Sequence, residues 1–389
     1  MANSPETLRA YAEVDLDALA HNVREVLTRT DADLMAVVKA DAYGHGAVGI
    51  ARTVLAAGAR MLGVATLDEA VTLRLAGIDA QLVCWLWTPQ EDLRYAVDTG
   101  VELVVYSLAH LARVLEFPVP DSRVPGRAPR IHLKADTGLG RGGATPADWQ
   151  ELCRAAAAAE RDGLITVVGL MSHLASADEE DDPSVGEQTE NFREMAAAAE
   201  AAGLTPEYRH LANSPGTLDH PATHFDLVRC GIALYGLDPL RADATPGGRQ
   251  VDPGLRPVMT LRSRVVLTKR VPAGHGVSYG LTYRTPAETT LALIPLGYAD
   301  GIPRSASSRG EVQVNGRRYR IAGRVAMDQF VIDVGDDPVE IGDQVVVFGP
   351  GDHGEPTVAD WATYAGTIHY EIVTRLGPRV PRVYIGGPS

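Results

Sequence analysis

A lysine closes an apolar run near the start of the chain. Residues 34–39 read LMAVVK, and the segment ADAYGHG that follows places Tyr43 four residues beyond Lys39. An ammonium group at the end of a buried strand is costly unless it is deprotonated, paired or used covalently. A lysine that reaches past the rim of a sheet into water would also explain this position. Gly44 and Gly46 let the backbone approach a ligand closely. They therefore favour the interpretation that Lys39 is a reactive amine beside a ligand.

Two later runs end in the small residues that a phosphate group needs. Residues 207–214 end in HLANS, and residues 226–236 continue from DLVRC into GIALYG. Backbone N–H groups in loops of this kind bind phosphate oxygens. Ser214, Gly231 and Ile232 are therefore candidates for a phosphate site, although glycine and serine are also ordinary loop residues.

A reactive lysine beside a phosphate site indicates a phosphate-bearing aldehyde that is held as a Schiff base. Pyridoxal phosphate fits this description, and a sugar-phosphate aldolase with a lysine imine is the alternative. Arg229 favours pyridoxal phosphate, because its guanidinium could donate a hydrogen bond to the pyridine nitrogen. His173 and His210 could support the ring, although each of them taken singly also fits a structural role.

An alternation of strands and helices must position these residues. Helical segments separate eight short apolar or β-branched runs, with alanine-rich segments at 147–162 and 187–202 and a capping box at Thr66 and Glu69. This pattern predicts an α/β fold, a parallel (β/α)8 barrel with its active site at the carboxyl ends of the strands. A doubly wound open sheet is the runner-up, but it usually has fewer strands. The strand candidates are 34–39, 62–65, 82–86, 102–106, 130–134, 164–170, 207–211 and 226–230.

The alternation breaks at 238–256, DPLRADATPGGRQVDPGLR, which is polar and rich in proline and glycine. Beyond it the apolar residues recur with a period near two, which is typical of strands, with an Asn315-Gly316 hairpin turn and a helical region at 357–376. We expect a barrel at 1–240, a linker at 241–256 and a mostly β domain at 257–389. The strand candidates of this domain are 258–271, 289–296, 310–321, 330–334, 343–348 and 380–385.

Composition argues against several kinds of partner. The chain of 389 residues has a net charge of -14, which repels nucleic acid and anionic membranes. We expect neither of these partners, and no metal. The first residues lack the basic and apolar segments of a signal peptide, and three scattered cysteines indicate no disulfide framework. A cytoplasmic location is therefore expected.

Nine segments, in order along the chain, resemble the alanine racemase family. Their number and spacing make this resemblance far more specific than any single motif. They are AVVKADAYGHG at 36–46, LKADTGLGRGG at 133–143, GLMSHLASAD at 169–178, HLANSPGT at 210–217, FDLVRCGIALYG at 225–236, PAGHGVSYGLTYRT at 272–285, GYADGIPR at 297–304, GRVAMDQF at 323–330 and TIHYEIVTRLGPRVPRVY at 367–384.

The resemblance implies an isomerase that interconverts L-alanine and D-alanine with pyridoxal 5'-phosphate and supplies D-alanine for peptidoglycan. It implies a barrel followed by a β domain, in a homodimer whose active sites lie at the subunit interface. Lys39 would bind the cofactor and act as one base, and the partner subunit's Tyr279 would be the opposite base. A pair of bases suits racemisation, because one fixed base cannot easily serve both faces of the α-carbon.

The resemblance also assigns the groups around cofactor and substrate. Arg229 would face the pyridine nitrogen with His210 behind it, and His173 would lie beside the ring. Ala326 stands where many members have cysteine, which predicts a smaller pocket wall there. The other cofactor-binding residues would be Tyr43, Asn213, Ser214, Gly231, Ile232 and Tyr370, and the substrate-binding residues Arg141, Met327 and Tyr298, with Lys134 as a lysine that some members carry as a carbamate.

Three alternatives stay open. A broader-spectrum racemase would act on serine or other amino acids. A decarboxylase of the same architecture would be expected to set an acidic group against the pyridine nitrogen, where Arg229 is basic. A non-catalytic pyridoxal phosphate-binding protein would need only the barrel, whereas this chain also has Tyr279 and a second domain.

Overall fold

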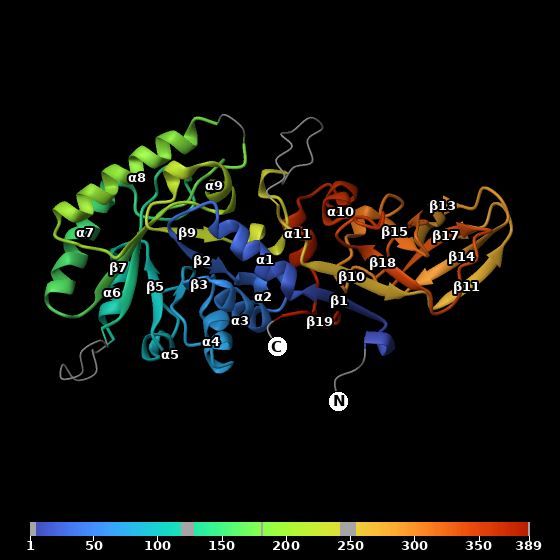
Figure 1. Cartoon of the computed structure of the whole chain (residues 1–389), viewed down its shortest axis with the longest axis horizontal. Helices are drawn as coiled ribbons and strands as arrows, with labels where there is room; N and C mark the ends of the chain where they lie inside the picture. The colour runs from blue at the N-terminus through green and yellow to red at the C-terminus, as the bar shows by residue number, and fades with distance from the viewer. Residues whose placement is uncertain (1–4, 118–127, 180–181, 242–253, 388–389) are drawn as a thin grey trace.

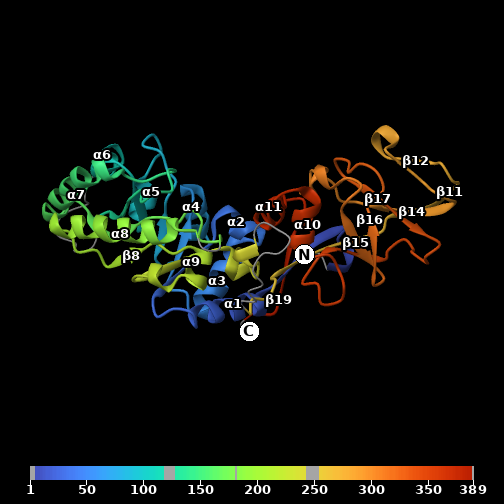
Figure 2. The same ribbon diagram turned by 90° about the horizontal axis from the view of Figure 1, so that it is seen from above.

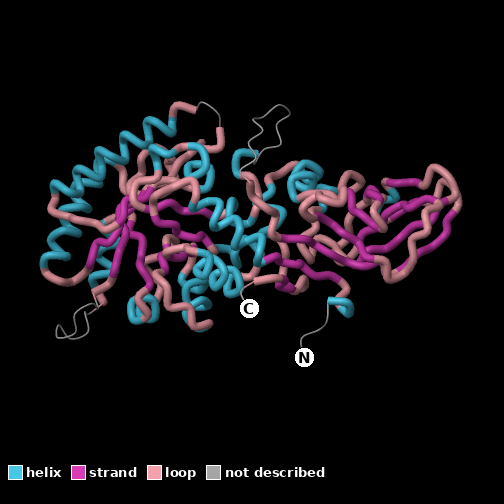
Figure 3. Tube along the Cα trace, in the orientation of Figure 1, coloured by secondary structure: helices cyan, strands magenta, loops and turns pink. Residues whose placement is uncertain are grey.

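Strands and helices divide the molecule into two parts, a barrel wrapped in helices and an elongated part dominated by strands (Figures 1 and 3). The computed structural model describes residues 5–117, 128–179, 182–241 and 254–387. Most of the linker expected at 241–256 lies outside the described residues. Within the described ranges, no helix is both long enough and apolar enough to cross a lipid bilayer.

The eight strand candidates of the first part form one parallel sheet, which confirms the predicted barrel. Its order is β8-β7-β6-β5-β4-β3-β2-β9. The backbone N–H of Asp226 donates to the carbonyl of Arg209 at 3.0 Å, so the two end strands nearly close the ring. The strands are β2 (Asp33–Val37), β3 (Met61–Val64), β4 (Leu82–Cys84), β5 (Val101–Val105), β6 (Arg130–Lys134), β7 (Thr166–Met171), β8 (Tyr208–His210) and β9 (Leu227–Cys230).

Helices alternate with the barrel strands, and several of them begin at a side-chain cap. Asp15 accepts hydrogen bonds from the first turn of α1, and the predicted capping box of Thr66 and Glu69 starts α4. The two alanine-rich segments are α7 and α8, as expected. The helices are α1 (Leu16–Leu27), α2 (Lys39–Gly44), α3 (Ala47–Ala57), α4 (Leu67–Leu75), α5 (Arg94–Asp98), α6 (Leu108–Leu115), α7 (Pro146–Arg161), α8 (Ser184–Ala201) and α9 (Ser214–Asp219).

Among its described residues, the second part has three sheets and two α-helices, which confirms a mostly β domain. A six-stranded sheet has the order β16-β15-β18-β10-β1-β19, in which β1 is Ala10–Asp15, and β11-β14-β17 and β12-β13 form smaller sheets. The elements are β10 (Met259–Arg264), β11 (Leu267–Val271), β12 (Gly276–Val277), β13 (Tyr283–Arg284), β14 (Thr289–Ile294), β15 (Glu311–Val314), β16 (Arg317–Arg320), β17 (Phe330–Gly335), β18 (Gln344–Phe348), α10 (Val358–Ala365), α11 (His369–Thr374) and β19 (Arg382–Ile385).

Turn chemistry explains where this part agrees with the predicted pattern and where it differs. Asn315 and Gly316 have φ of 50° and 78°, the left-handed conformation that a two-residue hairpin of the predicted kind needs. The run at 258–271 is two strands rather than one, because β10 and β11 join different sheets. The helical region at 357–376 is two helices, because Gly366 ends α10 with φ of 69°.

The first strand of the chain lies in the C-terminal sheet. Strand β1 (Ala10–Asp15) pairs antiparallel with β10 and parallel with β19, although its residues fall in the range 1–240 that was assigned to the barrel. Its partners are more than 240 residues away, for example Ala12 opposite Leu261, so no local pattern could reveal the pairing. The chain therefore starts in one part and then enters the other, which ties the two together.

Candidate active site

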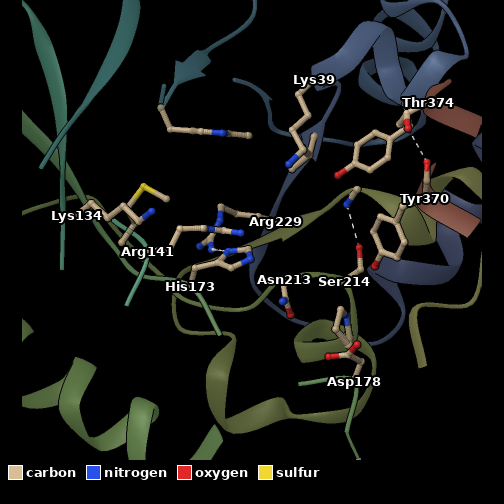
Figure 4. A pocket seen from close by; sticks show the side chains of 16 residues that line it. Lys39, Lys134, Arg141, His173, Asp178, Asn213, Ser214, Arg229, Tyr370 and Thr374 are labelled. Atoms are coloured by element: carbon tan, nitrogen blue, oxygen red, sulfur yellow. Dashed lines mark hydrogen bonds between the residues drawn. The ribbon is translucent and has the colours of Figure 1, made fainter. Parts of the chain in front are cut away.

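A cavity of about 440 Å³ opens at the carboxyl ends of the barrel strands (Figure 4). This volume lies within the range of roughly 300–1,000 Å³ that is common for small-molecule sites. Side chains from the barrel and from α11 meet there. Of the residues that the sequence predicts for the site, the cavity is lined by Lys39, Tyr43, Lys134, Arg141, His173, Asn213, Ser214, Arg229, Gly231 and Tyr370.

Lys39 enters the cavity from an unusual backbone turn. One residue, Val38, separates it from the end of β2, and residues 40–43, none of them glycine, have φ values of 52°, 52°, 54° and 53°. A left-handed conformation costs an L-amino acid roughly 1–2 kcal/mol per residue. Such a turn persists only where the surrounding structure over-determines it, which is typical of functional sites.

Contacts from both parts of the molecule hold this turn in place. Glu69, in the first turn of α4, accepts a hydrogen bond from the Ala40 N–H at 2.6 Å. At the other end, a Cβ on Gly44 would lie 2.2 Å from the carbonyl oxygen of Val373, so only glycine lets α11 pack directly against the turn. Figure 2 shows α11 beside α2 at the junction of the two parts. The C-terminal domain therefore helps to position Lys39.

The loops after β8 and β9 form a cradle of small groups. The Ser214 Oγ accepts a hydrogen bond from the Gly231 N–H at 3.0 Å, which joins the two loops. A Cβ on Gly231 would lie 2.3 Å from the Tyr43 hydroxyl, so the close approach requires glycine. Asn213 caps α9 by accepting from the Gly216 N–H at 3.0 Å. Burial raises the pKa of Tyr43, which keeps its hydroxyl protonated and able to donate.

Arg229 is buried and anchored on one side of the cavity. Its Nη1 donates to the His210 carbonyl at 2.8 Å and to the His210 Nδ1 at 3.1 Å. Its Nη2 donates to the carbonyls of Ser172 and Leu211 at 2.7 and 3.1 Å and lies 3.2 Å from the His173 Nδ1. Within the described ranges, the Arg229 Nε has no hydrogen-bond acceptor. Its N–H is therefore available to a ligand.

The cavity is strongly cationic in a chain whose net charge is -14. Lys39, Lys134, Arg141 and Arg229 all line it. Burial and the neighbouring Arg141 lower the pKa of Lys39, and burial with Arg229 and Arg141 lowers that of Lys134 to about 8. Burial and the surrounding cations hold the pKa of His173 far below its ordinary value, so its imidazole is neutral. Such a site suits a ligand that carries phosphate and carboxylate groups.

Five predicted site residues lie outside the cavity of this chain. His210 and Ile232 are buried behind its wall. Tyr279, Tyr298 and Met327 lie in the C-terminal domain, where their exposed fractions are 69%, 40% and 52%. Tyr298 and Met327 lie close together, because the N–H of Ala299, the residue after Tyr298, donates to the carbonyl of Met327 at 2.9 Å. The single chain therefore does not bring these three side chains to Lys39.

Several lining residues were not predicted. Trp85 directly follows β4, so its place at the carboxyl end of a barrel strand was a usable signal. Asp178 lies in one of the segments that resemble the alanine racemase family, but the sequence predicted no role for it. Among the described lining residues, Asp178 is the acidic one. Thr374, in α11, carries no signal in its own surroundings. Across the described ranges, no group of three His, Cys, Asp or Glu could hold a metal ion.

Comparisons with known proteins agree along the whole chain. The family model described as "Alanine racemase, N-terminal domain" matches residues 14–239, and "Alanine racemase, C-terminal domain" matches residues 258–384. An alanine racemase of Streptomyces coelicolor is 56% identical over 384 residues, which cover 97% of this chain and 96% of that protein.

Solved structures resemble this one closely. The alanine racemase from D-cycloserine producing Streptomyces lavendulae is 54% identical, with a TM-score of 0.93 and 99% of both chains covered. The enzyme of Bartonella henselae, solved with covalently bound pyridoxal phosphate, is 29% identical, with a TM-score of 0.84 and coverage of 97% of this chain and 99% of that one. The chain belongs to the alanine racemase family, isomerases that interconvert L-alanine and D-alanine.

Proposed function

We propose that the cavity holds pyridoxal 5'-phosphate and that alanine is racemised there between two bases, Lys39 and the partner subunit's Tyr279. The distribution of lysines carries this proposal. The chain has three lysines, and two of them, Lys39 and Lys134, line one cavity. The third, Lys269, is exposed on β11. A buried lysine with a lowered pKa is the amine that reacts with an aldehyde.

The residues present fit this cofactor. The cradle of Ser214, Gly231 and Tyr43 offers two hydroxyl donors for a phosphate group, and Gly231 leaves space beside them because it has no side chain. The Arg229 Nε–H is left for an acceptor such as a ring nitrogen, and Lys39 is the amine for an aldehyde. When bound, pyridoxal phosphate supplies a carbonyl for covalent attachment and a ring that withdraws electrons from the α-carbon of an amino acid.

Arg229 would keep the ring nitrogen unprotonated. Burial lowers its pKa to about 10, which still leaves the guanidinium charged at neutral pH. A charged guanidinium donates a hydrogen bond without giving up its proton. The ring opposite it is then a weaker electron acceptor than a protonated one, which disfavours side reactions such as transamination.

Lys39 and Tyr279 would handle the protons on opposite faces of the substrate. Racemisation removes a proton from one face of the α-carbon and returns one to the other face. The lowered pKa of Lys39 favours the neutral amine, which can accept a proton at Nζ. The hydroxyl of Tyr279 would serve the second face.

Arg141 would bind the substrate carboxylate at the side of the cavity where Lys134 also lies. The pKa of about 8 at Lys134 leaves part of this amine neutral near physiological pH. A carbamate forms from the neutral amine, so the modification implied by the family resemblance is chemically accessible and stays a prediction.

A homodimer would complete the site. Tyr279, Tyr298 and Met327 are exposed on the C-terminal domain of a chain whose Lys39 cavity lies in the barrel. Large exposed apolar groups often mark an interface. We infer that a second copy places this surface over the cavity, so that each site takes Lys39 from one subunit and Tyr279 from the other.

A reduction experiment and a chiral assay test the proposal together. Borohydride should fix pyridoxal phosphate to the purified protein, and peptide mapping should find the adduct at Lys39. The protein should convert L-alanine to D-alanine, as measured by chiral chromatography. Lys269→Arg is the matched control and should change neither result. An adduct at Lys134 or Lys269, or no D-alanine from protein that has bound the cofactor, would overturn the assignment.

A further inference from the structure

A row of four buried side chains crosses the barrel interior beneath the cavity. The Glu102 Oε2 lies 2.8 Å from the His132 Nε2, and the His132 Nδ1 lies 2.9 Å from the His210 Nε2. The His210 Nδ1 lies 3.1 Å from the Arg229 Nη1. The exposed fractions of Glu102, His132, His210 and Arg229 are 1%, 0%, 0% and 5%. Four strands, β5, β6, β8 and β9, each contribute one member.

Only one arrangement of protons satisfies all three hydrogen bonds. Arginine can only donate, so the His210 Nδ1 must be the bare acceptor and its Nε2 must carry the proton. That N–H points at the His132 Nδ1, which must then also be bare. The remaining proton of His132 sits on Nε2 and points at Glu102, whose ionised carboxylate can only accept. Arg229 at one end and Glu102 at the other therefore require the same arrangement, in which both histidines are neutral and carry their proton on Nε2.

The charges at the two ends support this direction. Burial by itself raises the pKa of Glu102, but hydrogen bonds from His132 and Arg130 outweigh it and lower that pKa to about 2. The Arg130 Nε donates to the other carboxylate oxygen at 2.7 Å. Burial and the cation of Arg229 hold the pKa of His210 well below its ordinary value. An anion and a cation are thus joined through two neutral rings.

Strand β7, which lies between β6 and β8, leaves space for this row because it has a glycine there. His132 pairs with Gly169 of β7, and a Cβ on Gly169 would lie 2.0 Å from the His132 Nδ1. No flexible side-chain tip could move aside there, because the clash involves a ring that is itself fully buried. Glycine at this position therefore lets the two imidazoles meet across β7.

We propose that Glu102 and His132 are positioning residues for Arg229, which act by fixing His210 in the tautomer that accepts from the guanidinium. With Nη1 held in this way, the Arg229 Nε–H stays aimed at its ligand. The inference rests on the proposed contact between Arg229 and the ring nitrogen of pyridoxal phosphate. It adds two residues that do not line the cavity.

The first test measures the wild-type holoenzyme, and substitutions serve only to identify its signals. The nitrogen spectrum of holoenzyme labelled with 15N-histidine reports which ring nitrogens carry protons, and the His132 and His210 signals are identified from His132→Asn and His210→Asn proteins. Both rings should be neutral with the proton on Nε2. A charged His210, or a proton on its Nδ1, would overturn the proposal whether or not Glu102→Gln and Gly169→Ala fold.

The second test removes the anion at the far end of the row. Glu102→Gln keeps the shape, but an amide can donate as well as accept, so the tautomers are no longer enforced. We expect a second His210 tautomer and a loss of pyridoxal phosphate affinity of about 10-fold. This is the lower end of the loss in metal affinity when a residue that orients a metal ligand is removed. Gly169→Ala should displace the His132 ring and weaken cofactor binding in the same direction.

Trp149→Phe is the matched control, because it removes a buried hydrogen bond of 2.7 Å between α7 and the carbonyl of Met195, away from the row. It should lower the free energy of unfolding without changing the His210 signals or the cofactor affinity. If Glu102→Gln folds and leaves both the His210 signals and the cofactor affinity unchanged, Glu102 is not a positioning residue. If the wild-type protein binds no pyridoxal phosphate at all, it is the proposed function that fails instead.

Discussion

The carboxylate of Glu69 lies 2.6 Å from the backbone nitrogen of Ala40, the residue that follows Lys39. Its other oxygen accepts from the N–H groups of Ala65 and Thr66 at 2.8 and 3.2 Å. One side chain therefore fixes both the left-handed turn that carries Lys39 and the start of α4. This double role distinguishes Glu69 from an ordinary capping residue.

Glu69→Ala should destabilise the fold and also weaken cofactor binding. Loss of a cap costs about 0.5–2 kcal/mol, and the strained turn loses its anchor as well. Asp360→Ala is the matched control, because Thr357 and Asp360 form the same capping box on α10, in the other domain. Urea unfolding should show losses for both variants, whereas titration with pyridoxal phosphate should show weaker binding only for Glu69→Ala. Equal cofactor affinity in the two proteins would contradict the double role.

Lys39 and Lys134 should titrate below the ordinary range of lysine in cofactor-free protein. Burial disfavours the charged ammonium, so Lys39 and Lys134 should lose their protons at lower pH than an ordinary lysine side chain. Lys134 should titrate near pH 8. Reductive methylation with 13C-formaldehyde, followed by carbon spectra over a pH series, gives one curve for each lysine. Curves for Lys39 and Lys134 that lie at the ordinary pKa of lysine would show that the cavity does not perturb its amines.

Tyr279→Phe should separate the two half-reactions. The side chain is 69% exposed in the single chain, so the change should alter the free energy of unfolding by no more than about 0.5 kcal/mol. Lys39 would remain as the one base, and the family resemblance assigns D-alanine to its face. In heavy water the variant should exchange the α-hydrogen of D-alanine much faster than that of L-alanine. Similar exchange of both enantiomers would exclude Tyr279 as the second base.

Mixing two inactive variants should restore activity if the site spans two subunits. Lys39→Ala and Tyr279→Phe proteins each lack one base at every site. After subunit exchange, a mixed dimer would hold one site with both bases intact and one with neither. Racemisation should therefore rise above that of either protein alone, while mixing each variant with itself is the control. Mixed dimers that are isolated and still inactive would place both bases in one chain.

Local sequence determined much of the barrel and of its cavity. Eight apolar runs that alternate with helices predict parallel strands, because each run buries both faces. The carboxyl ends of such strands meet at one rim, which is why Lys39, Ser214, Gly231 and Arg229 could be expected to gather there. The capping box at Thr66 was also readable, because a cap depends on residues three positions apart.

Tertiary structure decided what depends on residues far apart in the chain. The pairing of β1 with β10 needs partners that a periodic pattern cannot identify. The left-handed turn after Lys39 contains no glycine, so its conformation is imposed by Glu69 and by the packing of α11. Glu102 and His132 look like ordinary residues in apolar strands; only the register of neighbouring strands, with Gly169 between them and His210, brings their polar atoms into one hydrogen-bonded row.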